Sequence, residues 1–206
     1  MCSEHPSALI PALECLVVTG KREAIPMVDP DSALIEAIGR GDHEAFESLV
    51  KKYQRPLLNF IARYTGDRSM AEDITQEVFL RIYRAAPRFQ AKTKVSTWIF
   101  HIAYNQALTE IGRRKKRRNL WQALYRSREK ASEELLAEPL ERYDQTEEIL
   151  AVLGCLPENQ KAALLLRINE NLSYREIAGI LGVSVQSVES LLFRARTNLK
   201  RNLGKK

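Results

Sequence analysis

The sequence predicts an all-α protein made of two small helical domains that are joined by a flexible linker. From Asp31 onward, apolar residues recur every three or four positions, whereas the apolar–polar alternation that is typical of β-strands is scarce. A stretch at about residues 119–145 has weaker apolar order and contains Pro139, which favours a linker there. With 206 residues, 45% of them hydrophobic, the chain is long enough for each domain to bury a core.

Composition and charge narrow the class of protein. The formal net charge of +6 and the pI near 9.3 favour a polyanionic partner. The cysteines are widely spaced and the histidines isolated, so we expect no metal site, no cofactor and a reducing cytoplasm. The apolar segment 8–18 is broken by Pro11 and Glu14 and fails as a signal peptide, and no apolar run reaches the roughly 20 residues of a membrane span. We therefore expect a cytoplasmic protein without membrane insertion.

The first domain is expected at residues 30–118, after a loose extension of residues 1–29. Apolar residues at helical spacing predict its helical segments, at about residues 34–38, 43–55, 57–64, 71–85 and 97–112. Asp42 is the expected N-cap of the second segment and Ser96 that of the last. A loop that carries three cations, residues 86–94, precedes the last helix.

The second domain is expected at residues 146–206, with helices at about residues 147–153 and 157–168. After these, Ser173 followed by Glu176 forms a capping box that places the start of a helix at Tyr174. Gly182 supplies the left-handed residue that ends this helix, and Ser184 can cap the next one. Two helices joined by so tight a turn predict a helix-turn-helix.

The second helix of this motif has two distinct faces. The expected core side consists of Val185, Val188, Leu192, Ala195 and Leu199. The opposite side gathers small polar residues, an aromatic residue and an arginine: Gln186, Ser187, Ser190, Phe193, Arg194 and Thr197. This composition suits insertion into the major groove of DNA, with basic residues such as Arg196 and Lys200 adding phosphate contacts. The alternative is a helical hairpin with a merely solvated outer face.

The last helix of the first domain predicts a different nucleic-acid surface. Four residues share one side of it, next to a loop with Lys92 and Lys94: Thr97, Trp98, His101 and Asn105. An aromatic ring among amides and cations suits single-stranded DNA, because unstacked bases stack on aromatic rings. Arg113 and Arg114 begin a basic run, residues 113–118, that could hold the adjoining backbone. The alternative is that Trp98 belongs to the core and the basic run is solvated.

An acidic face is predicted on the helix at residues 71–83. Glu72 and Gln76 are four positions apart, as are Asp73 and Glu77, and we expect no basic partner at the next helical turn. Such a face suits a basic protein partner. A metal or acid–base site, as in a small helical nuclease or hydrolase, is disfavoured because no third type of ligand lies nearby.

Several motifs occur in an order that resembles the extracytoplasmic-function sigma factors of bacterial RNA polymerase, over about residues 31–203. The motifs are "AFESLVKKY", "AEDITQEVFLRIYR", "VSTWIFHIAYNQALTEIGRRKKR" and "LPENQKAALLLRINENLSYREIAGILGVSVQSVESLLFRARTNLKR". The resemblance implies a region 2 domain, a region 4 domain and transcription initiation without enzymatic activity. It also implies core RNA polymerase and promoter DNA as partners, and control by an anti-sigma factor.

The resemblance also implies roles for individual residues. The helix at residues 71–83, with Phe79, would dock on the coiled coil of the polymerase clamp, and residues 89–118 would open and read the minus-ten element. The helix-turn-helix, with Tyr174 and Arg175 in its first helix, would read the minus-thirty-five element. Some positions depart from the family pattern: Tyr104 stands where arginine is frequent, and Glu189 where many members carry a cation. A stand-alone helix-turn-helix regulator with a helical sensor domain is the alternative.

Overall fold

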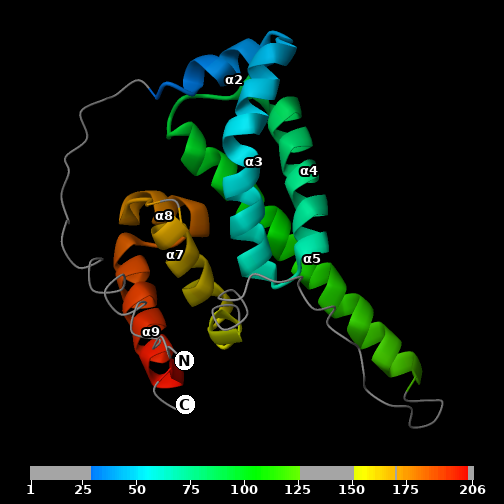
Figure 1. Ribbon diagram of the computed structural model, residues 1–206, viewed down its shortest axis with the longest axis vertical. Helices are drawn as coiled ribbons and strands as arrows, with labels where there is room; N and C mark the ends of the chain where they lie inside the picture. The colour runs from blue at the N-terminus through cyan, green and yellow to red at the C-terminus, as the bar shows by residue number, and fades with distance from the viewer. Residues whose placement is uncertain (1–28, 126–150, 170, 204–206) are drawn as a thin grey trace, which may run out of the picture.

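The computed structural model describes residues 29–125, 151–169 and 171–203, and all regular structure within them is helical (Figure 1). This confirms the predicted fold class. The expected extension, most of the linker and the start of the helix at 147–153 lie outside the described residues. The first domain contains α2 (Ser32–Gly39), α3 (His43–Thr65), α4 (Arg68–Ala85), the short 3₁₀ helix η3 (Ala86–Arg88) and α5 (Val95–Tyr125). The second contains α7 (Glu158–Asn169), α8 (Tyr174–Leu181) and α9 (Val185–Leu203).

Aspartate side chains begin the two helices that form the body of the first domain. Oδ1 of Asp42 accepts from the N–H of Ala45 at 3.0 Å at the start of α3, as predicted. The two segments on either side of Pro56 form one helix, which ends at Gly66 with a φ of 73°. Asp67 then caps α4 by accepting from the N–H of Met70 at 2.9 Å.

The prediction for α5 was wrong at both ends. The helix begins at Val95 instead of Thr97, and the N–H of Val95 donates to Oδ2 of Asp29 at 2.5 Å. A carboxylate 66 positions away therefore caps this helix, which local sequence cannot reveal. At its other end α5 passes Gly112 and the basic run and continues to Tyr125. Arg, Lys, Leu, Gln and Ala are good helix formers, so one glycine, at about 1 kcal/mol, does not end the helix.

The core of the first domain lies between α3, α4 and α5. Phe60 of α3 meets Phe100 of α5 edge-to-face, with ring centroids 5.6 Å apart. Aliphatic side chains fill the remaining space, among them Leu49, Leu57, Ile61, Ile74, Val78, Ile82 and Ile99. This packing fixes which sides of α4 and α5 face outward.

The second domain is the predicted helix-turn-helix, with α7 packed against both of its helices. The capping box of Ser173 and Glu176 is present, and Gly182 adopts a φ of 67°. Oγ of Ser184 accepts from the N–H of Ser187 at 3.2 Å and so caps α9. The expected core side of α9 is buried except for Val185, which is 41% exposed. Val185 is the first residue of α9, and this side enters the core only from Val188 onward.

The two domains touch, which nothing in the sequence pattern predicts. The second domain lies against α3 and the first half of α5 (Figure 1). Nζ of Lys94 lies 2.9 Å from Oε1 of Glu176, and the hydroxyl of Tyr104 donates to Oδ1 of Asn159 at 3.3 Å. The linker therefore connects two domains that are in direct contact.

Within the described ranges, no single helix is long and apolar enough to cross a membrane. Only α8 and α9 taken together pass on length and composition, and they are bent by 97°.

Candidate nucleic-acid and protein interfaces

The outer side of α9 is an exposed surface that we call the duplex face: Gln186, Ser187, Ser190, Phe193, Arg194 and Thr197. Phe193 is 68% exposed, so this ring contributes little to the core. The hydroxyl of Ser190 donates to the Gln186 carbonyl at 3.1 Å, so its proton is used, whereas its oxygen can still accept a hydrogen bond. In contrast, the side chains of Gln186 and Arg194 make no hydrogen bond or ion pair with any described residue. The duplex face thus presents an amide and a guanidinium that are free to bind a ligand.

Two residues beside the duplex face are less accessible than predicted. The Tyr174 ring is partly buried and lies 5.6 Å from the guanidinium carbon of Arg167, a cation–π distance. Arg196 is also partly buried, and its Nε has no hydrogen-bond partner among the described residues. Arg175 is exposed. Of these three residues, Arg175 is thus the one that could most easily reach a phosphate.

The exposed side of α5, which we call the single-strand face, consists of Trp98, His101 and Asn105. His101 and Asn105 are exposed, with Nδ2 of Asn105 3.1 Å from Nε2 of His101. Trp98 is half-buried, with its ring centroid 4.8 Å from that of Phe89. Thr97 is 6% exposed, so the prediction that it shares this surface was wrong.

The two lysines of the preceding loop differ in their surroundings. Lys92 is exposed and makes no side-chain hydrogen bond or ion pair with the described part of the chain. Lys94 pairs with Glu176 of α8. Burial raises the pKa of Glu176, but hydrogen bonds from Ser173 and the charge of Lys94 outweigh it and leave that pKa below its usual range. Only Lys92 is therefore free to meet a phosphate in this arrangement.

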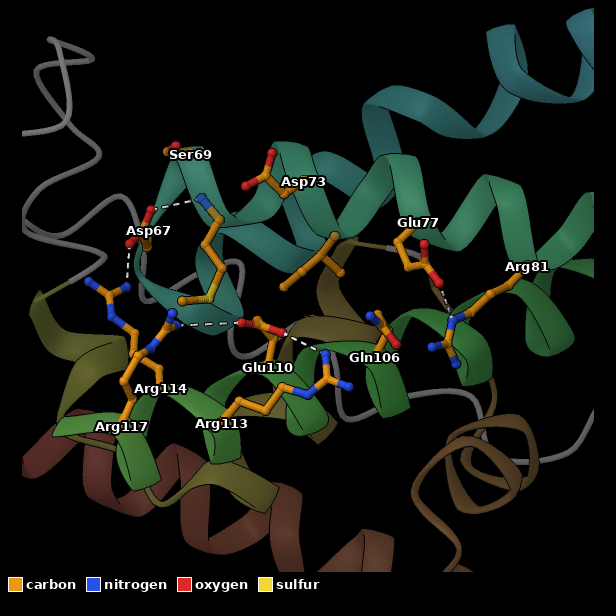
Figure 2. Close-up of a pocket in the computed structure, with 12 residues that line it drawn as sticks. Asp67, Ser69, Asp73, Glu77, Arg81, Gln106, Glu110, Arg113, Arg114 and Arg117 are labelled. Atoms are coloured by element: carbon orange, nitrogen blue, oxygen red, sulfur yellow. Dashed lines mark hydrogen bonds and ion pairs between the residues drawn. The ribbon is translucent and has the colours of Figure 1, made fainter. Parts of the chain in front are cut away.

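The first part of the basic run faces the acidic helix across a groove of about 740 Å³ between α4 and α5 (Figure 2). Arg114 pairs with Asp67 at 2.5 Å, and Arg113 with Glu110 at 3.4 Å. The Met70 amide hydrogen bond, more than the Arg114 guanidinium, holds the pKa of Asp67 below its usual range. The two predicted surfaces, one for DNA and one for protein, therefore meet in one groove. The positions of these two surfaces in the sequence do not indicate that they lie in the same groove.

The acidic face of α4 is partly neutralised within its own helix. Glu77 accepts from Nε of Arg81 at 2.9 Å, so the prediction that no basic partner stands one turn away was wrong. Glu72 pairs with Arg68 at 3.3 Å. Asp73 is exposed and has no ion pair with any described residue. Asp73 therefore remains the uncompensated negative charge of this face.

The prediction also named the wrong apolar residue for the outer side of α4. Phe79, predicted to contact a partner, is 7% exposed and packs edge-to-face against Phe46. Leu80 is 49% exposed instead. It lies on the same helical stripe as Asp73 and Gln76, seven and four positions before it. The signal was present in the sequence, since Leu80 falls outside the spacing of the core residues Ile74, Val78 and Ile82.

No group of three His, Cys, Asp or Glu side chains in the described ranges is arranged to hold a metal ion. Among the cysteines, Cys155 is described, and it is exposed with a free thiol.

Comparison with known families matches both domains. The model of Sigma-70 region 2 matches residues 49–118, and that of Sigma-70 region 4 matches residues 146–199. The RNA polymerase sigma-H factor of Pseudomonas aeruginosa is 35% identical over 184 residues, which cover 85% of this chain and 94% of that protein. The ECF RNA polymerase sigma-E factor of Escherichia coli K12 is 33% identical over 180 residues, which cover 81% and 90%.

Two solved structures share the fold. CnrH in complex with the cytosolic domain of CnrY superposes with a TM-score of 0.64 at 24% identity, over 85% of this chain and 98% of CnrH. The sigma factor RpoE of Bartonella quintana, in complex with the anti-sigma factor NepR, gives 0.62 at 21% identity, over 78% and 96%. At these identities, the likeness concerns the fold alone.

Proposed function

This chain belongs to the extracytoplasmic-function sigma factors of bacterial RNA polymerase, and we propose how its surfaces divide the work of that family between two kinds of DNA and one protein. As a sigma factor it directs promoter recognition and has no enzymatic activity. Family membership decides against a stand-alone regulator and against a hydrolase. We assign region 2 to residues 30–118, the linker to 119–145 and region 4 to 146–206, and we place the protein in the cytoplasm with its polymerase.

The duplex face of α9 binds the minus-thirty-five element in this proposal. The observation that carries it is the pair of unoccupied side chains, Gln186 and Arg194, beside the exposed ring of Phe193. An arginine can bond both acceptors of a guanine in the major groove, and an amide both groups of an adenine. Ser187, Ser190 and the flanking Arg175 complete the contact, whereas Tyr174 and Arg196 support it from partly buried positions.

The single-strand face of α5 holds the melted minus-ten element. His101 and Asn105 offer exposed polar groups, and the half-buried Trp98 offers the accessible part of its ring, on which an unpaired base can stack. Lys92 adds a free cation at one end, and Lys94 adds a second when its pair with Glu176 opens. Arg113 and Arg114 lie farther along α5, where Arg113 pairs with Glu110 of the same helix and Arg114 pairs with Asp67 at the start of α4. We therefore assign these two arginines a weaker part in DNA binding than Lys92.

The outer stripe of α4 binds core polymerase. It combines the unpaired charge of Asp73, the amide of Gln76 and the exposed Leu80. An apolar residue among polar groups is typical of the central contact of a protein interface. Glu72 and Glu77 stand at its edges, already paired with arginines, and Phe79 supports the helix from the core.

An anti-sigma factor is the further partner that we propose. The RpoE protein of Bartonella quintana is bound by the anti-sigma factor NepR in its solved structure. For this chain we expect a protein inhibitor that competes with core polymerase, so that adding core polymerase releases it in a pull-down.

Transcription by reconstituted holoenzyme tests the duplex assignment. Promoters with a randomised upstream element are transcribed with the natural chain and with Arg194→Ala, and the surviving sequences are compared. We expect Arg194→Ala to relax the preference at one or two adjacent base pairs, by about 1 to 3 kcal/mol for a good contact. Arg55→Ala, an exposed arginine of α3, is the matched control. An unchanged preference at every upstream position would overturn the assignment.

A pull-down with core polymerase tests the α4 assignment. Asp73→Lys reverses the unpaired charge, and Leu80→Ala removes the exposed apolar group. Each should weaken binding by about tenfold or more, which corresponds to roughly 1.4 kcal/mol. Glu36→Lys, a charge reversal at an exposed position of α2, should bind normally. Full binding by both α4 variants with unchanged helicity would refute the assignment.

A further inference from the structure

Asp29 joins the start of α2 to the start of α5. Its Oδ2 accepts from the N–H of Val95 at 2.5 Å, and its Oδ1 accepts from the N–H of Asp31 at 3.1 Å. Its backbone carbonyl accepts from the N–H of Ser32, the first residue of α2, at 2.9 Å. The N–H groups in the first turn of a helix have no partner inside that helix, so a carboxylate that accepts from one of them stabilises the turn. Asp29 is therefore part of two helix starts at once.

The neighbouring Asp31 fixes the place of this cap. Asp31 is 6% exposed, and its carboxylate accepts from Nζ of Lys52 at 2.5 and 2.7 Å and from the hydroxyl of Tyr53. Both donors belong to α3, which packs against α2, α4 and α5. Because the N–H of Asp31 donates to Asp29, the carboxylate that caps α5 is tied to the body of the first domain.

The loop before α5, residues 86–94, is held at both of its ends by this part of the chain. At its start, η3 packs so closely on α2 that a Cβ at Gly39 would lie 3.2 Å from the carbonyl oxygen of Ala86. At its end, the hydrogen bond to Asp29 fixes the first residue of α5. Between these points, residues 90–94 are exposed. The loop therefore takes its position largely from its two ends.

The cap stands one helical turn from the single-strand face. Trp98 follows Val95 by three positions, which is about 4.5 Å along the helix axis at about 1.5 Å per residue. Lys92, the free cation of the loop, precedes Val95 by three positions. If the first turn of α5 frays, both groups move, because this turn sets the direction of Trp98 and the end of the loop. A binding group keeps its geometry when hydrogen bonds close to it hold its support.

The charge of Asp29 makes its role as a cap testable. A carboxylate beside the cations of the loop repels the phosphates of DNA, so on charge alone its removal would strengthen DNA binding. The loss of the cap would have the opposite effect, because the first turn of α5 would be less ordered. The two effects differ in sign, and substitutions can separate them.

We infer that Asp29 is a positioning residue for promoter opening: it orders the first turn of α5 and thereby holds Lys92 and Trp98 where they meet the melted strand. In this role Asp29 acts through α5 and makes no contact with DNA. The inference rests on the proposed function, because the single-strand face is assigned there to the minus-ten element. It adds that opening depends on a residue 66 positions before the helix that binds the strand.

Permanganate footprinting with reconstituted holoenzyme tests the inference through three substitutions at one position, on a promoter that the natural chain opens. Asp29→Ala removes both the cap and the charge, so thymine reactivity in the downstream element should fall by about two- to fivefold, the factor expected for a lost N-cap. Asp29→Asn keeps an acceptor oxygen without the charge, so reactivity should match or exceed that of the natural chain. Asp29→Glu keeps the charge but adds a methylene that displaces the carboxylate, so reactivity should fall as in Asp29→Ala.

Asp42→Ala is the matched control. Asp42 caps α3 through the N–H of Ala45 at 3.0 Å, so its loss removes the same kind of hydrogen bond from the same domain. It should cost comparable stability in urea unfolding but leave thymine reactivity close to that of the natural chain, because the start of α3 carries none of the single-strand face. A pull-down with core polymerase should show normal binding for every variant, which excludes polymerase loading as the cause.

Hydrogen exchange in the free chain measures the cap itself, without DNA. The amide of Val95 should exchange faster in Asp29→Ala and Asp29→Glu than in the natural chain and in Asp29→Asn. Circular dichroism checks the fold of each variant. If Asp29→Ala unfolds the first domain, Asp29→Glu takes its place in every comparison.

Reactivity as low in Asp29→Asn as in Asp29→Ala would overturn the inference, and so would normal reactivity in both Asp29→Ala and Asp29→Glu. Asn105→Ala in the same assay separates this inference from the proposed function. Normal reactivity in Asn105→Ala would refute the single-strand face itself. A defect in Asn105→Ala with none in Asp29→Ala would refute the positioning role alone.

Discussion

The duplex face of α9 and the single-strand face of α5 differ in how much the rest of the molecule shapes them. The duplex face projects away from its domain, with Phe193 68% exposed and Arg194 unpaired among the described residues. The single-strand face is embedded: Trp98 rests on Phe89, and Lys94 is held by the other domain. The arrangement of the duplex face depends on α9 alone. The arrangement of the single-strand face also depends on Phe89 and on the second domain.

The sharpest test of this difference compares the aromatic residues of the two faces. Trp98→Ala should lower the free energy of unfolding of the first domain by about 2 kcal/mol, less than the roughly 3–5 kcal/mol of a fully buried ring. Phe193→Ala should change stability by no more than about 0.5 kcal/mol. Urea unfolding followed by circular dichroism measures both. Equal losses would remove the contrast between the faces.

Promoter opening separates the faces by function. Asn105→Ala should leave closed complexes nearly normal but reduce melting, because we assign duplex anchoring to the other domain. We expect a loss comparable to one polar base contact, about 1 kcal/mol. Permanganate reactivity of thymines in the downstream element, with holoenzyme carrying the variant, is the measurement. A premelted template should restore activity, whereas normal reactivity on the duplex would contradict the prediction.

Acid should weaken the second domain through Glu176, whose pKa is lowered in the folded state. A carboxylate with a lowered pKa stabilises the fold above its unfolded value of 4.5, and this contribution is lost as the pH falls through the lower folded value. Glu176→Gln keeps hydrogen-bonding groups but not the charge. The difference in thermal midpoint between the natural chain and this variant should shrink between pH 6 and pH 3. A constant difference would show that the charge contributes nothing.

The smallest expected effect concerns the far half of α5. Gly112 lies inside the helix with open space around its Cα, so Gly112→Ala should stabilise α5 by about 0.5 to 1 kcal/mol. Helical content by circular dichroism should rise slightly, and promoter selection should not change. A loss of stability would mean that the helix needs to bend at this glycine.

The second domain was predicted well because the residues that determine its helix ends and faces lie next to one another in the sequence. The capping box, the left-handed Gly182 and the polar side of α9 all lie within a few residues of the structure that they specify. Val185 was misplaced only because it stands at the very start of the helix. Such patterns need no knowledge of distant parts of the chain.

The first domain was predicted less well because its determinants are distant in sequence. Asp29 caps a helix that starts 66 positions later, and Asp67 accepts a hydrogen bond from Arg114, which is 47 positions away. The core position of Phe79 and the exposure of Leu80 depend on how α4 meets α3 and α5. The contact of Tyr104 with Asn159 joins two domains across the linker. A single sequence carries no signal for such pairs.

The length of α5 has a mechanical consequence. Its 31 residues form a rod of about 46 Å, and the part beyond Gly112 carries the chain about 20 Å away from the body of the first domain (Figure 1). The tether to the second domain therefore starts from a fixed point in space rather than from the domain surface. If the second domain leaves the first, a stiff first segment would narrow the volume that the second domain explores, and so would raise its local concentration near DNA bound by the first domain. Shortening this rod would lower that concentration without altering any residue that touches a base.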